Sequence, residues 1–306
     1  ERVTFMDIAI AGGTGLVGQG LTEYLIDNGH KVFILTRDTS NKENTEQIKY
    51  VEWLTGNATP EVELHSVEAF VNLAGESINS GRWTEERKHR ILESRLSSTK
   101  EIVRIMSAMV NKPSVLVNAS AIGYYGTSET DVFTENDQVA GNDFLATTVS
   151  QWEEESLEAE THGIRTVLTR FGIILDKEDG ALPRMILPYK LFAGGTVGSG
   201  QQWMSWVHIQ DVIRIIDFCI KNECMQGAVN VTAPHPKRMY EFGKTIGKVM
   251  NKPHWIPAPS FALKIALGEM SDLVLKGQKV MPAKLERAGF HFSFPHLDEA
   301  LKDILK

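Results

Sequence analysis

The sequence predicts a doubly wound α/β protein built around a parallel sheet and followed by a smaller lobe. Short apolar segments recur along the first 175 residues, and longer amphipathic segments separate them. Strands that alternate with helices pair in parallel, because each helix returns the chain to the same end of the sheet. After about residue 176, Gly and Pro become frequent and the periodicity is mostly helical. We therefore divide the chain into a sheet domain at residues 6–175 and a mostly helical lobe at residues 176–306.

The predicted strands and helices alternate in a regular order. Five apolar segments predict strands, at residues 7–11, 31–36, 68–75, 114–120 and 165–175. Helical spacing of apolar residues predicts helices at residues 16–28, 84–110 and 143–161, and in the lobe at about 209–222, 238–250 and 260–277. Gly29 is expected to end the first helix, and Asn142 or Asp143 to cap the third. The acidic run at residues 153–155 is expected to form a solvated helix face.

Composition narrows the class of protein. The formal charge is −7 and no basic run occurs, so neither nucleic acid nor a membrane is expected as a partner. The two cysteines, Cys219 and Cys224, match neither a disulfide framework nor a metal-binding pair. No apolar run approaches the ~18 residues needed to span a bilayer, and no secretory signal pattern occurs. We expect a reducing, cytoplasmic setting and no metal site.

A glycine-rich turn joins the first predicted strand to the first helix in the pattern G-x-x-G-x-x-G. Glycines are needed there because the strand turns tightly, a pyrophosphate approaches bare backbone and the helix packs closely on the sheet. The N–H groups at the start of the helix then bind the phosphates. The turn therefore predicts a Rossmann-type dinucleotide site. Its predicted cofactor contacts are Gly12, Thr14, Gly15, Leu16, Val17 and Gly18.

The end of the second strand indicates which dinucleotide binds. An acidic residue at this place binds the ribose of NAD, whereas an arginine accommodates the 2′-phosphate of NADP. The chain has Thr36 followed by Arg37, and a guanidinium grips a phosphate through paired hydrogen bonds. This favours NADP. Asp38 leaves NAD as the alternative, because a shifted register would place its carboxylate at the ribose.

Several motifs together resemble a known family. The glycine turn, NLAG at residues 72–75, NASAIGYYG at 118–126 and WVHIQDV at 206–212 resemble an extended short-chain dehydrogenase/reductase of the nucleotide-sugar epimerase branch. The segments at 81–99, 194–211 and 277–301 are similar to the subgroup called epimerase family proteins, which carry a C-terminal domain of unknown function. The resemblance covers nearly the whole chain after Met6.

This resemblance implies further site residues. Leu73, Ala74 and Gly75 should line the adenine and ribose side of the cofactor, and Arg95 should face it. Ser120 matches the catalytic serine of the family and also lies beside the cofactor, while Ile174 should pack near the nicotinamide.

The proton-transfer pair of the family is missing. Active members carry Tyr-x-x-x-Lys on one helix face, where the lysine lowers the pKa of the tyrosine so that it exchanges a proton with the substrate. The expected positions hold Phe144 and Thr148, and neither side chain can do this. Candidate replacements are Tyr125, its neighbour Tyr124, and Glu76.

Three other features have a functional and a structural interpretation. His208 and Asp211 in WVHIQDV are interpreted as attaching the lobe to the sheet. Lys88 and Arg90 with Trp83 suggest a basic edge for an anionic ligand, or ordinary solvated charges. The loop at residues 194–203 could cradle a phosphate through its N–H groups, or be a flexible loop.

Two functions follow from these patterns. The first is an NADP-dependent oxidoreductase or epimerase for a small, nucleotide-linked or other substrate, with Ser120 orienting the reacting carbonyl. The alternative is a catalytically silent NADP(H)-binding sensor or scaffold. A general acid or base typically contributes ~10² to 10⁴-fold in rate, so its loss slows chemistry without preventing cofactor binding.

Overall fold

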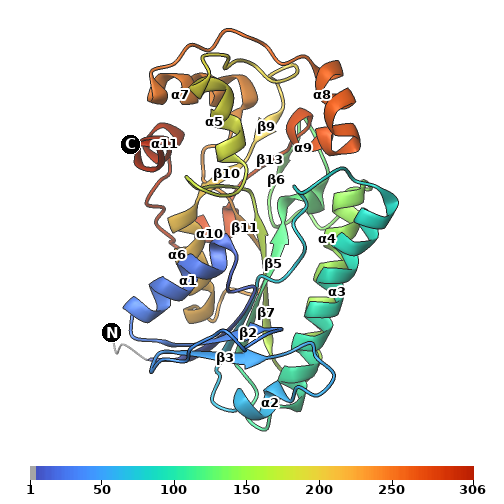
Figure 1. Cartoon of the computed structure of the whole chain (residues 1–306), viewed down its shortest axis with the longest axis vertical. Coiled ribbons are helices and arrows are strands. Elements are labelled where there is room, and N and C mark those ends of the chain that lie inside the picture. The colour runs from blue at the N-terminus through green and yellow to red at the C-terminus, as the bar shows by residue number, and fades with distance from the viewer. Residues whose placement is uncertain (1–4) are drawn as a thin grey trace.

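The computed structural model describes residues 5–306, and within them one seven-stranded sheet has every neighbouring pair of strands parallel. Its strands in chain order are β1 (Asp7–Ala11), β2 (Lys31–Thr36), β3 (Ile48–Glu52), β4 (Ala69–Asn72), β5 (Val115–Ala121), β7 (Arg165–Phe171) and β11 (Gly227–Val231). The spatial order is β3-β2-β1-β4-β5-β7-β11, so the chain starts in the middle and winds outward in both directions (Figure 1). The predicted doubly wound, Rossmann-type fold is confirmed.

Two helices cover each face of this sheet (Figure 1). On one face α1 (Leu16–Asp27) packs beside α6 (Ile209–Lys221), and on the other α3 (Glu85–Ala108) packs beside α4 (Phe144–Leu157). Alternate side chains of β1 serve the two faces: Ile8 and Ile10 join the α1 side, and Ala9 and Ala11 join the α3 side. Because β1 and β2 are buried on both faces, their sequences are continuously apolar, and this made them easy to predict.

Local signals explain where the long helices begin. The Thr84 side chain caps α3 by accepting a hydrogen bond from Arg87 N, and Glu85 and Glu86 occupy the first turn. Asp143, one of the two predicted caps, begins α4 by accepting from Ala146 N at 2.8 Å. A short helix, α2 (Pro60–Glu63), lies near the edge strand β3.

Two strands of the sheet were not predicted, because each lies at an edge. Residues of β3 are mostly half-buried, and its sequence, IKYVE, contains two charged residues instead of running apolar. β11 is short, and only its last three residues are buried. The predicted strand at residues 68–75 is shorter in the structure and ends at Asn72. The backbone leaves the sheet there and passes Gly12 of the glycine turn.

The lobe lies over the carboxyl end of the sheet (Figure 1). Its helices are α5 (Leu182–Lys190), α7 (Met239–Met250), α8 (Ser260–Leu267), α9 (Asp272–Leu275), α10 (Ala283–Arg287) and α11 (Leu297–Leu305). Two two-stranded pairs join it to the sheet domain: β8 (Ile173–Leu175) with β10 (Trp206–His208), and β6 (Val132–Phe133) with β13 (Lys279–Val280). A third pair, β9 (Trp203–Met204) with β12 (Lys237–Arg238), lies within the lobe. Three 3₁₀ turns complete the list: η1 (Ile122–Tyr125), η2 (Glu158–His162) and η3 (Gly268–Ser271).

The core of the lobe is separate from the two cores of the sheet. Trp206, Phe242 and Leu301 are fully buried at its centre, between α5, α7 and α11. The helix predicted at residues 260–277 is instead α8, η3 and α9, because Gly268 takes a φ of +61° and ends α8. No helix in residues 5–306 is long and apolar enough to cross a membrane.

His208 at the N-cap of α6 and Asp211 in its first turn attach the C-terminal segment, in line with the interpretation of these two residues from the sequence. The fully buried Asp211 carboxylate accepts hydrogen bonds from Ser293 N (2.8 Å) and Phe294 N (2.9 Å). The His208 ring stacks on Phe294 at 3.9 Å, and its Nε2 lies 3.2 Å from Asp303 Oδ2. His208 Nδ1 also accepts from Gln210 N and so caps α6. These contacts hold residues 293–303 against the sheet domain.

His208 makes stability depend on pH. Burial lowers the pKa of His208, although the carboxylates of Asp303 and Asp211 oppose this. As the pH falls through ~6.5, the unfolded chain binds a proton that folded His208 resists, so stability present at neutral pH is lost in acid. His208→Asn keeps a capping acceptor without a titrating group, and we expect its melting temperature to fall less between pH 8 and pH 5 than that of the wild type. His162→Asn, at an exposed histidine, should match the wild type, and equal slopes for all three proteins would contradict this role.

Candidate functional site

The glycine turn brings the backbone of β1 into contact with the segment after β4. Gly12 has a φ of +77°, and a Cβ at this residue would lie 2.6 Å from the carbonyl carbon and oxygen of Leu73. A Cβ at Gly18 would lie 2.3 Å from Gly12 O, inside the first turn of α1. Both glycines are therefore required by packing alone. Gly15 is exposed, and its nearest neighbour would be 3.5 Å away, which leaves its outer side open.

The start of α1 can hold an anion. Gly15 is its N-cap and makes no side-chain cap, and no acidic residue lies in the first turn. The first N–H groups of an α-helix have no partner within the helix, so those of Leu16 and Val17 can bind phosphate oxygens. The exposed Thr14 lies at the same opening and is oriented by Gln19, whose Nε2 donates to Thr14 O at 2.8 Å.

At the end of β2 the guanidinium of Arg37 is free within residues 5–306, whereas the neighbouring carboxylate of Asp38 is hydrogen-bonded. Asp38 accepts hydrogen bonds from Ser40 N (2.8 Å) and Ser40 Oγ (2.6 Å), which hold its pKa below the usual value. Thr36 Oγ1 donates to Asp38 O and closes the turn. Arg37 is exposed and makes no hydrogen bond or ion pair to any other residue in the range 5–306. An incoming anion would therefore meet a guanidinium with no competing partner.

Arg95 lies where the segment after β4 meets α3. Its guanidinium is close enough to Gly75 that a Cβ there would lie 3.3 Å from Arg95 Cζ, and it rests over the Trp152 ring at 5.0 Å. Arg95 Nη1 donates to the carbonyls of Glu76 and Ile91. Burial lowers the pKa of Arg95 to about 10, and the Glu76 charge only partly opposes this. A half-buried guanidinium held by carbonyls instead of a carboxylate is suited to an added negative ligand.

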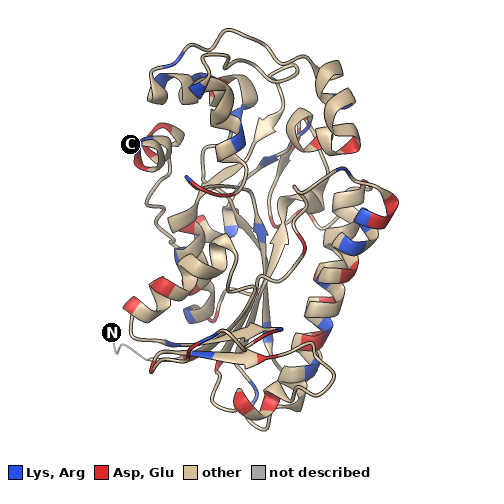
Figure 2. Cartoon of the chain, viewed as in Figure 1, with Lys and Arg blue, Asp and Glu red and all other residues tan. Residues whose placement is uncertain are grey.

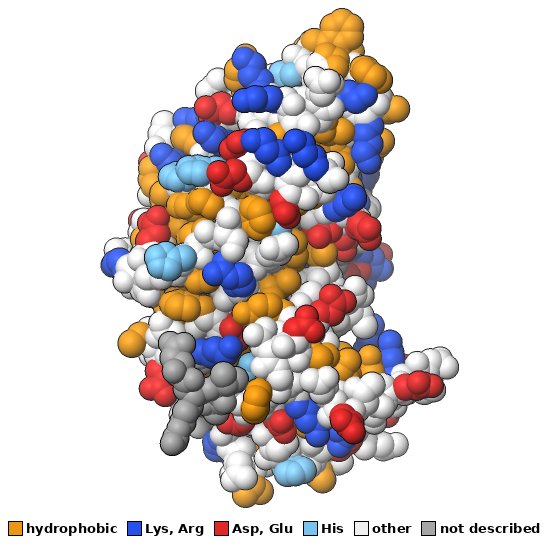
Figure 3. Space-filling view, turned by 90° about the vertical axis from the view of Figure 1, so that its left-hand side faces the viewer, with side chains coloured by type: hydrophobic (Ala, Val, Ile, Leu, Met, Phe, Trp, Pro, Cys, Tyr) orange, Lys and Arg blue, Asp and Glu red, His pale blue; other side chains and the backbone are white. Residues whose placement is uncertain are grey.

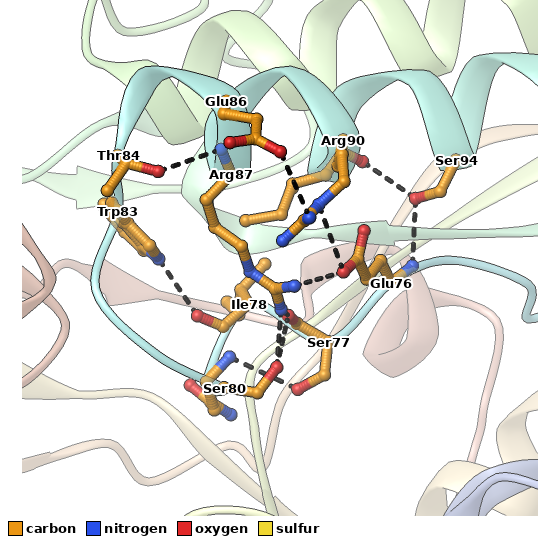
Figure 4. A network of polar contacts seen from close by, with 12 residues as sticks. Glu76, Ser77, Ile78, Ser80, Trp83, Thr84, Glu86, Arg87, Arg90 and Ser94 are labelled. Carbon is orange, nitrogen blue, oxygen red and sulfur yellow. Dashed lines mark hydrogen bonds and ion pairs between the residues drawn. The ribbon is translucent and has the colours of Figure 1, made fainter.

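Residues 76–84 form a loop fastened beneath the first turns of α3 (Figure 4). The Glu76 carboxylate pairs with Arg87 and lies 3.8 Å from Arg90. Arg87 also donates to Ser77 O and Ser80 Oγ, so its side chain fills the inside of the loop. Trp83 Nε1 donates to Ile78 O at 3.0 Å. The carboxylate of Glu76, a candidate proton donor, is thus paired with the guanidinium groups of Arg87 and Arg90.

The predicted basic edge consists of paired charges. Lys88 contacts Glu85 at 3.1 Å and Glu269 of the lobe at 2.5 Å, and Arg90 contacts Glu86. The same loop reaches the lobe again through Arg82, which donates to the carbonyls of Ile265 and Ala266 at the end of α8. These contacts connect the two parts of the protein across the carboxyl edge of the sheet.

The loop at residues 194–203 has little free backbone for a phosphate. Gly198 N donates to Ala258 O and Gly200 N to Val197 O, while Gly194 and Gly195 are packed against Tyr189 and Ile256. The loop is therefore an internal packing element of the lobe in this structure.

Ser120 belongs to a buried polar network that ties α4 to the sheet. Its Oγ donates to Glu153 Oε1 at 2.6 Å, and Arg170 on β7 donates to both Glu153 oxygens at 2.8 Å. Ser120 is 2% exposed, Arg170 4% and Glu153 5%. Burial opposes the charge of Arg170, but the hydrogen bonds and charge of Glu153 outweigh it and raise its pKa. Glu153 was expected on a solvated face and is instead buried, because α4 turns it toward β5 and β7.

The two tyrosines after Ser120 pack around Arg170. The Arg170 guanidinium lies 3.5 Å from the Tyr124 ring centre and 4.9 Å from that of Tyr125. Tyr125 is 5% exposed, and its hydroxyl donates to Asn230 Oδ1 at 2.7 Å. Burial raises the pKa of Tyr125 to about 12, although Arg170 opposes this. Tyr124 donates to Gln138 O.

Helix α4 presents no proton carrier at the expected places. Phe144 packs edge-on against Trp83 at 5.2 Å, Thr148 is buried, and the Trp152 indole donates to Thr99 of α3. This stripe therefore faces α3. Leu145, the next residue round the helix, faces Gly123 of η1, where a glycine Cβ would lie 3.4 Å from the Leu145 Cβ. All of these side chains lack a titrating group near neutral pH.

The structure brings most of the predicted site to one edge. The glycine turn, Thr36–Arg37, Leu73–Gly75 and Ser120 follow or end β1, β2, β4 and β5, whose carboxyl ends meet. Ile174 lies in β8, just beyond the end of β7, half-buried against the α6 side of the core. The residues that the sequence did not reveal are Arg87, Glu153 and Arg170. A run of three acids preceded by Trp152 held no signal that one of them is buried.

Comparisons with known proteins agree with this arrangement. Residues 8–232 match the profile described as NAD dependent epimerase/dehydratase family, and residues 258–304 match a domain of unknown function, DUF1731. Epimerase family protein YfhF of Bacillus subtilis (strain 168) is 48% identical over 302 residues, which cover 98% of each chain.

Two solved structures are similar over nearly all of this chain. Human epimerase family protein SDR39U1 (isoform 2) with NADPH has a TM-score of 0.85 at 30% identity, covering 98% of this chain and 99% of that one. A nucleoside-diphosphate sugar epimerase from Corynebacterium glutamicum has a TM-score of 0.80 at 28% identity, covering 99% of this chain and 59% of that one.

The buried network should contribute to stability independently of any catalytic role. Glu153→Gln leaves Arg170 buried without its counter-charge, and we expect the free energy of unfolding to fall by ~3 kcal/mol or more. Ser120→Ala removes one donor and should cost ~1–2 kcal/mol. Denaturant unfolding would measure both, with Glu154→Gln at the exposed neighbour as the matched control. A Glu153→Gln protein as stable as the control would show that the ion pair does not stabilise the fold.

Proposed function

Because this chain belongs to the NAD-dependent epimerase/dehydratase family, we propose that it binds NADP(H) at the carboxyl edge of its sheet and acts as an oxidoreductase or epimerase on a small molecule. The observation that carries the proposal is the end of β2, where Arg37 has no partner in residues 5–306 and Asp38 is bonded to Ser40. A free guanidinium favours the 2′-phosphate of NADP, and an occupied carboxylate is a poor acceptor for the ribose of NAD.

The other cofactor contacts fit this assignment. The bare start of α1 receives the pyrophosphate at the N–H groups of Leu16 and Val17, and Gly15 lets it approach. Leu73–Gly75 and Arg95 line the adenosine side, where Arg95 donates to the carbonyls of Glu76 and Ile91 and has no carboxylate partner within residues 5–306. Ile174 packs near the nicotinamide. NADPH in a structure 30% identical to this chain supports the same preference. When bound, the nicotinamide supplies a hydride or accepts one.

None of the chain's own residues in the described range is well suited to transfer a proton to the substrate. Ser120 is proposed to orient a substrate carbonyl, but its hydroxyl is hydrogen-bonded to Glu153 and buried. Tyr125 is the remaining candidate acid, and a pKa of about 12 makes it a slow proton donor near neutrality. Any turnover should therefore be slow, or rely on water or on a group of the substrate.

This weakness favours a second candidate function, a catalytically silent NADP(H) sensor or scaffold. Phe144, Thr148 and Leu145 carry no proton, Glu76 is bound to arginines, and Tyr124 donates to a carbonyl. The residues proposed to bind the cofactor are all present, whereas the proton donor is missing. Cofactor binding does not need a proton donor. In both functions we propose a cytoplasmic protein.

For the substrate we propose a small, nucleotide-linked molecule. The lobe covers the edge of the sheet where the cofactor would lie, as it must in order to enclose a second ligand. A relative 28% identical to this chain is named a nucleoside-diphosphate sugar epimerase, which supports this class.

Arg37 should decide the choice of cofactor. Replacing it removes the paired, charge-assisted hydrogen bonds to the 2′-phosphate, so Arg37→Ala should weaken NADPH binding ~10- to 100-fold and leave NADH binding unchanged. Isothermal titration or nicotinamide fluorescence would measure both affinities. Lys49→Ala, a neighbouring cation on β3 that pairs with Glu63, is the matched control and should bind both cofactors as the wild type does. Equal affinity of the wild type for NADPH and NADH would overturn the NADP assignment.

Turnover separates the enzyme from the sensor. We expect slow NADPH oxidation with some member of a panel of carbonyl compounds and nucleotide sugars, abolished in Ser120→Ala. Because Ser120→Ala also disturbs Glu153, its residual NADPH affinity must be measured and should remain near that of the wild type. Tight NADPH binding by the wild type with no turnover across the panel would instead support the sensor.

A further inference from the structure

The end of the lobe farthest from the sheet exposes large apolar side chains. We call residues 187–192 and 240–267 the lobe tip. The exposed side chains on it are Leu187, Leu191, Phe192, Trp255, Ile256, Phe261 and Ile265. Trp255 and Phe261 are each 68% exposed and Ile265 is 73% exposed. So many large apolar side chains exposed together are unusual for a soluble surface and mark an interaction site.

Helix α8 is the clearest part of this surface. Its sequence, SFALKIAL, is apolar except for Ser260 and Lys264, yet none of its residues is buried. The helix packs mainly on η3, and Phe261 and Ile265, one turn apart, face outward. Arg82 of the sheet domain holds its last carbonyls, so the helix is fixed in this exposed position.

The remaining exposed side chains are also held in place. Trp255 Nε1 donates to Phe192 O at 2.8 Å, and Trp255 N donates to Gly194 O. Lys252 Nζ lies 3.6 Å from the centre of the Phe192 ring. These contacts join the end of α5 to the segment between α7 and α8. The apolar side chains at the end of α5 and in the segment before α8 are therefore held in place by contacts with each other.

The lobe tip is basic although the chain is acidic. Its charged residues are Lys190, Lys244, Lys248, Lys252 and Lys264 against a single carboxylate, Glu241. The whole chain has a formal charge of −7. In Figure 2, α5 and α7 carry several Lys and Arg segments, and blue and orange side chains gather at the upper end of Figure 3. Of the three carboxylates of neighbouring α11, Asp298 pairs with Lys302 and Asp303 with His208, and Glu299 is exposed.

We propose that the lobe tip docks on the surface of an anionic phospholipid bilayer. Aromatic and aliphatic side chains enter the boundary between headgroups and acyl chains, and the lysines around them pair with lipid phosphates. Each lysine contributes about 1 kcal/mol near such a surface, which is about five-fold in binding. The tip thus offers both of the attractions that hold a peripheral protein on a membrane.

Two other occupants fit the surface less well. In a symmetric dimer the same patch meets itself, so five lysines would face five lysines with one glutamate on each side. A nucleic acid would satisfy the lysines but leave Leu187, Leu191 and Ile265 without bases to stack on. An anionic bilayer accepts both kinds of side chain.

The sequence alone predicted no membrane partner, because the five lysines are spread from residue 190 to 264 and form no basic run. In the structure they all lie in the lobe, on α5, α7, α8 and the segment between α7 and α8. This docking surface lies apart from the proposed cofactor site, so it stands or fails independently of the proposed function.

Vesicle flotation tests the proposal with the full chain. We expect binding to vesicles that contain phosphatidylglycerol, weaker binding in high salt, and little binding to phosphatidylcholine alone. Phe261→Gln with Ile265→Gln should lower binding ~10-fold or more, and Lys248→Gln with Lys264→Gln about five-fold per lysine. The matched control is Val110→Gln with Val139→Gln, which replaces valines 96% and 85% exposed on the sheet domain and should bind as the wild type does.

Folding is checked on every variant by its melting temperature and elution volume. Absence of binding to anionic vesicles, or tip variants that bind as well as the control, would overturn the proposal. So would a concentration-dependent dimer that the tip variants dissociate, or binding to single-stranded RNA in preference to vesicles.

Discussion

The ion pair between Glu153 and Arg170 constrains more of this site than any other contact. Both charges are out of water, and a buried carboxylate without its partner would cost several kcal/mol, so α4, β5 and β7 must keep their relative positions. Ser120 completes the network from β5, and Tyr124 and Tyr125 stack around Arg170. The residues that resemble catalytic groups are therefore also the structural residues of the carboxyl edge. Their chemistry cannot be altered without altering the packing of α4 on the sheet.

In the proposed function, cofactor binding and turnover depend on different features of this edge. The proposed dinucleotide contacts come mostly from backbone: the glycine turn, where Gly12 lies against Leu73, the bare start of α1, and the turn after β4. These depend on strand order and glycine spacing. Proton transfer depends on one side chain with a suitable pKa. The candidate, Tyr125, is buried, and burial raises its pKa to about 12. A fold can keep the first property after losing the second.

The lobe is fastened to the sheet domain at several points by polar contacts. Asp211 and His208 hold the C-terminal segment, Arg82 holds the end of α8, and Lys88 pairs with Glu269. These contacts surround the edge where cofactor and substrate would lie. Because Arg82 holds the end of α8, which is part of the lobe tip, the proposed docking surface and the proposed site belong to one connected unit. A rigid connection of this kind would orient the cofactor edge relative to a membrane.

The sequence by itself determined the parallel sheet and the glycine turn, because apolar runs and glycine spacing are local patterns. It also singled out Arg37 as a candidate cofactor contact, because this residue comes just after a predicted strand. It also indicated that the positions expected for the Tyr-x-x-x-Lys pair hold Phe144 and Thr148. It did not predict β3 or β11, whose edge positions leave them half-exposed and without an apolar run. Only the tertiary structure decided that Glu153 is buried while Glu154 is exposed, that Glu76 is bound by Arg87, and that the lobe with the five lysines also exposes large apolar side chains. Each of these depends on which face of an element meets which neighbour, and that is set by packing between segments far apart in the chain.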